Sequence, residues 1–347
     1  MRKYILIFPL ILLLSSCFSI RGVIGLLDPL YQWNLVDIGI ENAWSYSKGN
    51  HNITVAIIDS GVDFTHPDLL DQSWNNPYEI PNNGLDDDNN GYIDDTMGWD
   101  FRDGDNDPSP GHTHGTFIAG LIAADDDGDI SVGVAPNIRI MALRFLKDDL
   151  SWSGPPFADE WPMFIEAINY AVDNNADVIH LSVQANGIPP SSFHEAIKRA
   201  YQNQIPIVSV TGNIYLGKNH VMYPGNYSEV IAVSATTKDH ELADFSCFGV
   251  QNEICAPGKE IYSIEAYNNE FVLGNGTSYA APLVSGAIAL MLSLNNNLSI
   301  QIIRSILHET STDLGTSGKD DYFGYGLLNV SAALENVTQT YGTTYIQ

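Results

Sequence analysis

The chain has 347 residues, of which 44% are hydrophobic, and this suits one large folded domain or two small ones. Its formal net charge is −27, with only 15 Lys and Arg residues. Such a charge keeps a protein soluble. It excludes a nucleic-acid partner, because too few cations are present to neutralise phosphates.

The first 17 residues have the composition of an export signal. A basic start at positions 1–3 precedes a short apolar run over 4–14. The run is too short for a comfortable transmembrane span. It ends at Leu14-Ser15-Ser16-Cys17, which resembles the lipobox of bacterial lipoproteins. Cys17 would then be lipidated and would anchor the protein to the cell envelope, at the cell surface or the periplasmic face. An ordinary secretory signal with an incidental cysteine, or an uncleaved anchor, is the alternative.

After the leader, residues 18–27 are predicted to be a tether, 28–335 a folded domain and 336–347 a polar tail without pattern. Residues 75–110 form a polar insertion rich in Asp, Asn and Gly. Strands alternate with helices through the domain, and this indicates a parallel sheet with helices on both faces. Strands are predicted at 55–58, 137–145, 178–183, 205–210 and 230–233, and helices at 33–44, 117–124, 164–172 and 193–201.

Three polar residues lie where such a fold places its active sites. Asp59 ends a continuously apolar strand, at the carboxyl edge of the sheet. His114 precedes an apolar helical stretch. Ser278 stands among small residues at the start of another helix, where free N–H groups and the helix dipole favour a developing negative charge. A serine nucleophile needs a positioned base and a group that orients this base. Each residue taken alone could be a structural cap.

Together the three motifs resemble the subtilisin-like serine proteases, or subtilases. The motifs are Asp59-Ser60-Gly61, His114-Gly115-Thr116 and Gly276-Thr277-Ser278, in the order Asp, His, Ser. The resemblance runs from about residue 28 to about residue 334. It implies an α/β fold of the subtilisin-like three-layer α/β/α type, with a central, mostly parallel sheet. It also implies a serine endopeptidase that forms an acyl-enzyme on Ser278, acts on peptide or protein substrates and, we expect, is a monomer.

Several positions depart from the family pattern. The family usually has Gly at Thr113, a second His at Phe117, Asn at His180 and Gly at Gln184. Many secreted members also carry a folding prodomain between leader and domain, and this chain is expected to have no room for one. The alternative hypothesis is therefore a catalytically inactive subtilase-fold protein that serves as a binding module at the surface.

The resemblance further assigns the oxyanion and substrate residues. Thr211-Gly212-Asn213 resembles the oxyanion segment, so the Asn213 amide would bind the tetrahedral oxyanion together with the Ser278 N–H. The substrate backbone would pair as an added strand. The side chain of Gln184 is expected to narrow the channel in which the substrate backbone lies. The residues expected to contact the substrate are Ser153, Gly154, Ser182, Val183, Gln184 and Gly212.

Two acidic loops predict calcium, the one cofactor that we expect. Residues 125–131 align with the high-affinity calcium loop of the family. Packing so many carboxylates together without a cation would be costly. The ligands expected here are Asp68, Asp125, Asp127, Asp129 and Ser131, with a further oxygen from Asp28 or Gln32.

The second acidic loop lies inside the insertion and resembles the first half of an EF-hand loop. The Glu usual at position 12 is missing, since Met97 stands there, and Asp94 or Asp95 would have to close the site. A solvated acidic loop is the alternative. The ligands expected in this loop are Asp86, Asp88, Asn90, Tyr92, Asp94 and Asp95.

Overall fold

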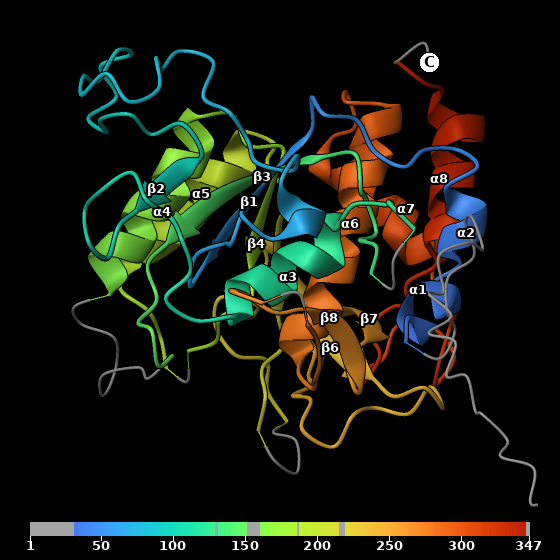
Figure 1. Cartoon of the computed structure of the whole chain (residues 1–347). Coiled ribbons are helices and arrows are strands. Elements are labelled where there is room, and N and C mark those ends of the chain that lie inside the picture. Colours follow the sequence, from blue (N-terminus) through green and yellow to red (C-terminus); the bar gives the residue numbers. More distant parts are fainter. Residues whose placement is uncertain are drawn as a thin grey trace, which may run out of the picture.

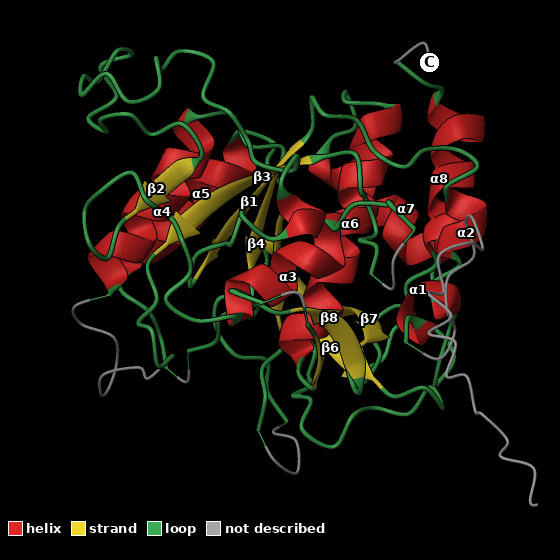
Figure 2. Cartoon of the chain, in the orientation of Figure 1, coloured by secondary structure: helices red, strands yellow, loops and turns green. Residues whose placement is uncertain are grey.

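The computed structural model describes residues 31–128, 131–150, 160–185, 187–214, 219–268 and 270–344. These residues form a central sheet with helices on both of its faces (Figure 1, Figure 2). This arrangement confirms the predicted three-layer α/β/α fold. The signal segment, the tether and five expected site residues lie outside the described residues. Those five are Cys17, Asp28, Asp129, Ser153 and Gly154.

The central sheet has seven strands in the order β2-β3-β1-β4-β5-β6-β7, and every neighbouring pair is parallel. A separate antiparallel hairpin is formed by β8 and β9. The bounds are β1 Thr54–Asp59, β2 Gly98–Asp100, β3 Arg139–Arg144, β4 Val178–Leu181, β5 Ile207–Val210, β6 Val230–Thr236, β7 Asn252–Pro257, β8 Ile261–Ile264 and β9 Phe271–Gly274.

The helices divide between the two faces of the sheet. In β1, Val55 and Ile57 pack into the hydrophobic cluster that contains α3 and α6, whereas Ala56 and Ile58 pack into the cluster that contains α4 and α5. Both faces of the strand are thus buried, which explains its continuous apolar sequence. The bounds are α1 Trp33–Asp37, α2 Ile40–Ala43, α3 His114–Ala123, α4 Trp161–Asp173, α5 Ser191–Gln202, α6 Thr277–Leu294, α7 Ile300–Thr310 and α8 Val330–Asn336.

Helix α6 runs through the core. Within the described part of the chain it is the one helix long and apolar enough to cross a membrane, but 94% of it is buried inside the protein. Its length and hydropathy are therefore those of a core helix. Because the helix is held on all sides, the residues at its N-terminus, including Ser278, stand on a rigid element.

Several elements were not predicted from the sequence. Strand β2 lies inside the polar insertion. Strand β7, Asn252–Pro257, is an edge strand that begins with two polar residues and ends with proline. Edge strands tolerate polar residues and proline, so their sequences lack the apolar signal of central strands. The tail was predicted to have no pattern, but residues Val337–Tyr341 extend α8 as a turn of π-helix.

Candidate active site

The expected site residues gather at the carboxyl edge of the sheet. Asp59 is the last residue of β1, Ser182 directly follows β4, and Asn213 comes shortly after β5. These three strands are neighbours in the sheet. Strand β3 lies on one side of β1, and β4 lies on the other, so the strand order reverses direction at β1. Open α/β sheets bind their ligands at the carboxyl ends of the strands where the order reverses in this way.

Asp59 and His114 form a buried pair. The Asp59 side chain is 1% exposed, and its Oδ1 lies 2.8 Å from Nδ1 of His114. The same oxygen accepts a hydrogen bond of 2.7 Å from the N–H of Ser60. Because an ionised carboxylate can only accept, Nδ1 of His114 carries the proton, and Nε2 is the nitrogen that can act as a base.

The pair shifts the pKa values of both members. Burial alone would raise the pKa of Asp59, but the charge of His114 and the hydrogen bonds from His114 and Ser60 lower it. Burial alone would lower the pKa of His114, but the charge and hydrogen bond of Asp59 raise it. The pair therefore stabilises a carboxylate beside an imidazole that readily accepts a second proton.

A small residue beside His114 allows α3 to lie close to the loop that follows Asp59. A Cβ at Gly115 would meet the carbonyl oxygen of Gly61 at 2.2 Å, so only glycine fits beside His114. The N–H of His114 donates to Nδ1 of His112 at 3.1 Å. His112 therefore supports the start of α3, and its imidazole is not the one paired with Asp59.

Ser278 is the second residue of α6 and is 8% exposed. Its hydroxyl donates to the carbonyl of Ser182 at 3.3 Å. The neighbouring ring of Tyr279 lies 6.0 Å from the imidazole of His114, measured between ring centroids, and 4.2 Å from the ring of Phe117. Phe117 thus packs on the residue that follows Ser278.

The amide of Asn213 is held in one orientation. Its Oδ1 accepts hydrogen bonds from the N–H of Thr277 at 2.8 Å and from the Thr277 hydroxyl at 2.9 Å. These bonds assign the oxygen of the amide and leave Nδ2 as the outward donor. No described residue accepts from Nδ2 of Asn213, so this donor is available next to the start of α6.

The side chain of Gln184, which is expected to narrow the substrate channel, bonds to the backbone of Asn213. Its Oε1 accepts a short hydrogen bond from the N–H of Asn213, and its Nε2 donates to the carbonyl of Asn213 at 3.4 Å. The side chain thus lies against the backbone of Asn213 and close to Gly212, whose φ is +112°. Of the other expected substrate residues, Val183 is 3% and Ser182 6% exposed.

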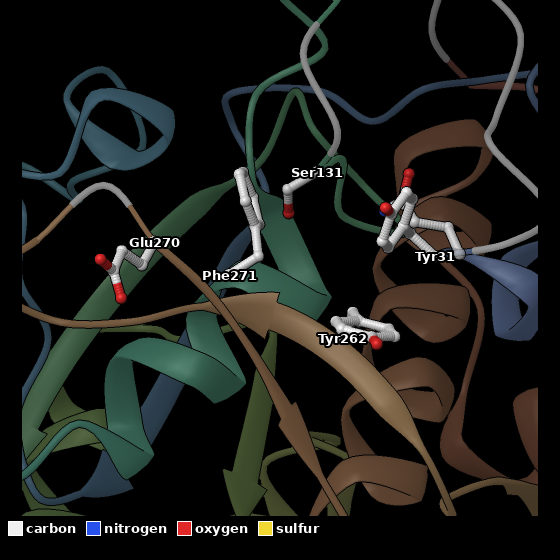
Figure 3. Close-up of a pocket in the computed structure, with 6 residues that line it drawn as sticks. Tyr31, Ser131, Tyr262, Glu270 and Phe271 are labelled. Atoms are coloured by element: carbon white, nitrogen blue, oxygen red, sulfur yellow. The ribbon is translucent and has the colours of Figure 1, made fainter.

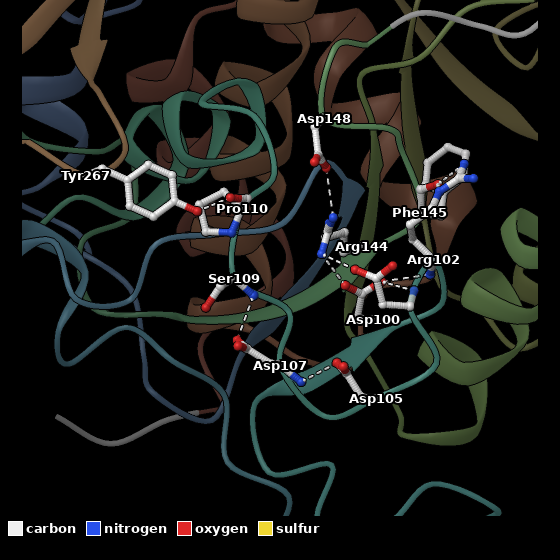
Figure 4. Close-up of polar contacts among 11 residues, drawn as sticks. Asp100, Arg102, Asp105, Asp107, Ser109, Pro110, Arg144, Phe145, Asp148 and Tyr267 are labelled. Atoms are coloured by element: carbon white, nitrogen blue, oxygen red, sulfur yellow. Dashed lines mark hydrogen bonds and ion pairs between the residues drawn. The ribbon is translucent and has the colours of Figure 1, made fainter.

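The loop that leads into His114 is held from two sides (Figure 4). Tyr267, between β8 and β9, donates its hydroxyl to the carbonyl of Pro110. On the other side Arg144 pairs with Asp148 at 2.8 Å and with the buried Asp100. A Cβ at Gly111 would meet the Asp148 carboxylate at 2.0 Å, so this ion-pair group lies directly against the loop.

Asp125, which begins the first acidic loop, lies next to Asp68. Asp68 is 3% exposed, and its carbonyl accepts from the N–H of Asp125 at 2.9 Å. Gln32 donates Nε2 to the carbonyl of Val132 at 2.9 Å, which leaves its Oε1 as the acceptor. A cavity of about 350 Å³ adjoins this region (Figure 3). It is lined by Tyr31, Gln32, Ser131, Tyr262, Glu270 and Phe271.

The carboxylate of Glu79, which is not among the expected ligands, lies close to the second acidic loop. Oxygen atoms of Glu79, Asp86 and Asp88 all lie within 4.8 Å of one another. No spacing rule predicts Glu79, because it approaches only where the chain folds back across residues 80–85. Within this segment the backbone has positive φ at Asn82 (+60°) and Gly84 (+75°).

Asp94 and Asp95, one of which is expected to close this loop around calcium, both accept hydrogen bonds from the protein. Both oxygens of Asp94 accept backbone N–H groups, from Asn83 at 2.9 Å and Gly84 at 2.8 Å. Asp95 is fully buried and accepts from Asn76, Asn90 and Tyr170. Neither residue belongs to the group of three carboxylates.

Comparison with known proteins agrees with this geometry. The model of the subtilase family matches residues 50–326. The chain belongs to the subtilase family. It is 34% identical over 288 residues to subtilisin DY of Bacillus licheniformis, covering 82% of this chain and 91% of that protein.

Two further subtilases are longer than this chain. The chain is 32% identical over 305 residues to the minor extracellular protease Epr of Bacillus subtilis (strain 168), covering 88% of this chain but 42% of Epr. It is 33% identical over 300 residues to the thermophilic serine proteinase of Bacillus sp. (strain AK1), covering 86% of this chain and 66% of that protein. The chain thus spans less than two thirds of the length of both relatives.

Proposed function

We propose that this subtilase is a serine endopeptidase, with Asp59, His114 and Ser278 as its catalytic triad. The observation that carries the proposal is the buried hydrogen bond of 2.8 Å between Asp59 and His114, at the sheet edge where α6 begins. Three relatives with protease names match over most of the chain. An inactive binding module would have no need of the buried carboxylate that orients the imidazole.

The proposed reaction begins at the hydroxyl of Ser278. Nε2 of His114 removes its proton as the oxygen attacks the scissile carbonyl, and the imidazolium that forms is stabilised by Asp59. Nδ2 of Asn213 and the N–H of Ser278 bind the negative oxygen of the tetrahedral intermediate. His114 then protonates the leaving amine, and water activated by the same imidazole hydrolyses the acyl ester.

A test is hydrolysis of reduced, unfolded casein, with the new peptide ends identified by mass spectrometry. Wild-type protein is expected to release internal peptides, and the Ser278→Ala variant is expected to release none above background. Cleavage by both proteins at the same rate would overturn the proposal.

We further propose that calcium stabilises the domain at the two acidic loops. The grouping of Glu79 with Asp86 and Asp88 supports the second site, because three nearby carboxylates repel one another unless a cation is present. The buried carboxylate of Asp68 beside the 125–131 loop supports the first. Hard oxygen ligands of this kind suit calcium, which would neutralise the loops and hold them together.

Export with a lipid anchor at Cys17 is also proposed, on the composition of residues 1–17. The name of Epr describes an extracellular protease, which supports export. Several acyl chains anchor a protein firmly, whereas one alone binds weakly. The Cys17→Ala variant is expected to leave the membrane fraction or to remain unprocessed. Mature-sized variant that still sediments with membranes would contradict the anchor.

A further inference from the structure

A histidine that the proposed mechanism does not use lies close to the nucleophile. His180 belongs to β4 opposite Ile57 of β1, and it is completely buried. Its Nδ1 lies 2.8 Å from the hydroxyl of Ser285, in α6, and its Nε2 lies 2.8 Å from the hydroxyl of Ser182. The imidazole therefore connects the strand that borders the site to the helix that carries Ser278.

The hydrogen bonds of this group have only one consistent direction. The Ser182 hydroxyl donates its single hydrogen to the carbonyl of Ser278 at 2.9 Å. It must therefore accept from His180, so Nε2 carries the imidazole proton. Nδ1 is then unprotonated and accepts from the Ser285 hydroxyl. The result is a directed chain from Ser285 through His180 and Ser182 to the backbone of Ser278.

His180 stays neutral in this place. Burial is the main cause that lowers its pKa, to about 3, and the positive charge of His114 lowers it further, against the opposing effect of Asp59. A neutral imidazole has one donor and one acceptor, and both are used here. Asp59 and His114 are the charged groups that act on it, and neither bonds to it.

Ser182 holds Ser278 from both sides. The Ser182 hydroxyl binds the carbonyl of Ser278, and the Ser182 carbonyl accepts the Ser278 hydroxyl at 3.3 Å. Any change in the position of Ser182 therefore moves the atom that attacks the substrate. Reacting groups need placement to within a fraction of an ångström, so small displacements lower the rate.

We propose that His180, held in one tautomer by Ser285, is a positioning residue that fixes Ser182 and through it the backbone and hydroxyl of Ser278. This inference rests on the proposed peptidase activity. Without Ser285, the proton of His180 could move to Nδ1. Ser182 would then donate to Nε2 and release the carbonyl of Ser278.

The test compares Ser285→Ala, Ser182→Ala and the double variant in peptide hydrolysis and in phosphonylation by a fluorophosphonate probe. Loss of one positioning hydrogen bond is expected to lower kcat and the phosphonylation rate by about five- to tenfold, with KM changed less than about twofold. Since both serines act through the same chain, the double variant is expected to lose no more than Ser182→Ala alone.

Ser293→Ala is the matched control. Ser293 is a buried serine of the same helix, but its hydroxyl donates to the carbonyl of Ala289 at 2.7 Å, away from His180. The kcat of Ser293→Ala is expected to match that of the wild type. The melting temperature of each variant is measured to show that it is folded. Wild-type protein that does not react with the probe overturns the proposed function. A reactive wild type with an equally reactive Ser285→Ala overturns only this inference.

A spectroscopic readout tests the tautomer directly. In ¹⁵N-histidine-labelled Ser278→Ala protein, which does not digest itself, His180 is expected to show a protonated Nε2 and an unprotonated Nδ1 from about pH 6 to pH 9, since its pKa lies far below this range. Replacing Ser285 by Ala is expected to change these signals, whereas Ser293→Ala leaves them unchanged. A protonated Nδ1, or a spectrum unaffected by Ser285→Ala, contradicts the proposed direction.

Discussion

The side-chain amide of Gln184 binds the backbone of Asn213 through both its oxygen and its nitrogen. A glycine, which the resemblance to subtilases leads us to expect at this position, has no side chain to make this contact. The contact ties the segment that follows β4 to the residue that is proposed to bind the oxyanion. Gln184 therefore supports the backbone of Asn213.

Replacing Gln184 by Ala is expected to lower kcat. The backbone of Asn213 would lose two hydrogen bonds, and their modest strength corresponds to a loss of about three- to tenfold, with little change in KM. Gln301→Ala, which removes an exposed amide bonded to Tyr201, is the control and is expected to leave kcat unchanged. Higher kcat/KM on bulky peptides would instead show that Gln184 narrows the channel.

Removing the amide of Asn213 itself is expected to cost far more. In a subtilisin, a relative of this chain, the loss of such an oxyanion donor lowers kcat by about 10²–10³. Asn213→Ala is expected to show a loss of that size with KM nearly unchanged, measured on a chromogenic peptide. If KM rises while kcat stays constant, Asn213 binds the ground state of the substrate and not its oxyanion.

The pH dependence of kcat/KM reports the pairing of Asp59 and His114. The proposed mechanism requires an unprotonated His114, and the Asp59 charge raises the pKa of His114 in spite of its burial. The acid limb of the wild-type profile should therefore lie above pH 6.5, the ordinary pKa of histidine. In Asp59→Asn the burial remains and the negative charge is lost.

The acid limb of Asp59→Asn should accordingly move to lower pH, and kcat should fall by about 10⁴ because the imidazole loses its orientation. The two effects are measured together in one pH–rate series. An acid limb that stays at the wild-type position would mean that Asp59 does not set the pKa of His114.

Removal of calcium is expected to destabilise the protein. At a thousandfold excess over Kd, a bound ion stabilises the folded state by about 4 kcal/mol, which for a domain of roughly 300 residues corresponds to a melting temperature higher by about 6 °C. Thermal unfolding in chelator and in millimolar calcium measures this difference. Magnesium should not replace calcium, because it demands a smaller and more regular ligand set. Equal melting temperatures in chelator and calcium would identify the loops as acidic surface.

Two variants distinguish the ligands of the insertion. Glu79→Gln is expected to reduce the stabilisation by calcium, since Glu79 belongs to the group of three carboxylates. Asp94→Asn is the matched control. It weakens a turn at Asn83 and Gly84 and should lower the melting temperature equally with and without calcium. If Asp94→Asn reduced the stabilisation by calcium and Glu79→Gln did not, Asp94 would be a calcium ligand.

The sequence was sufficient for the parts of the site that rest on regular structure. Asp59 follows an apolar strand, and His114 and Ser278 precede apolar helices, so local patterns placed all three at the ends of elements. The contacts of Gln184, Glu79 and His180 depend instead on how loops and strands distant in sequence meet. Hydrophobic periodicity carries no information about the direction of a polar side chain at the end of a strand.

Covalent labelling of Ser278 tests the central claim most directly. Folded, calcium-loaded protein is incubated with a fluorophosphonate, and the adduct is located by peptide mass spectrometry. The account predicts one adduct, on Ser278, that is absent from Ser278→Ala and forms far more slowly in His114→Ala, because only an activated serine attacks phosphorus at neutral pH. Folded wild-type protein without an adduct, or an adduct formed equally fast in His114→Ala, would contradict it.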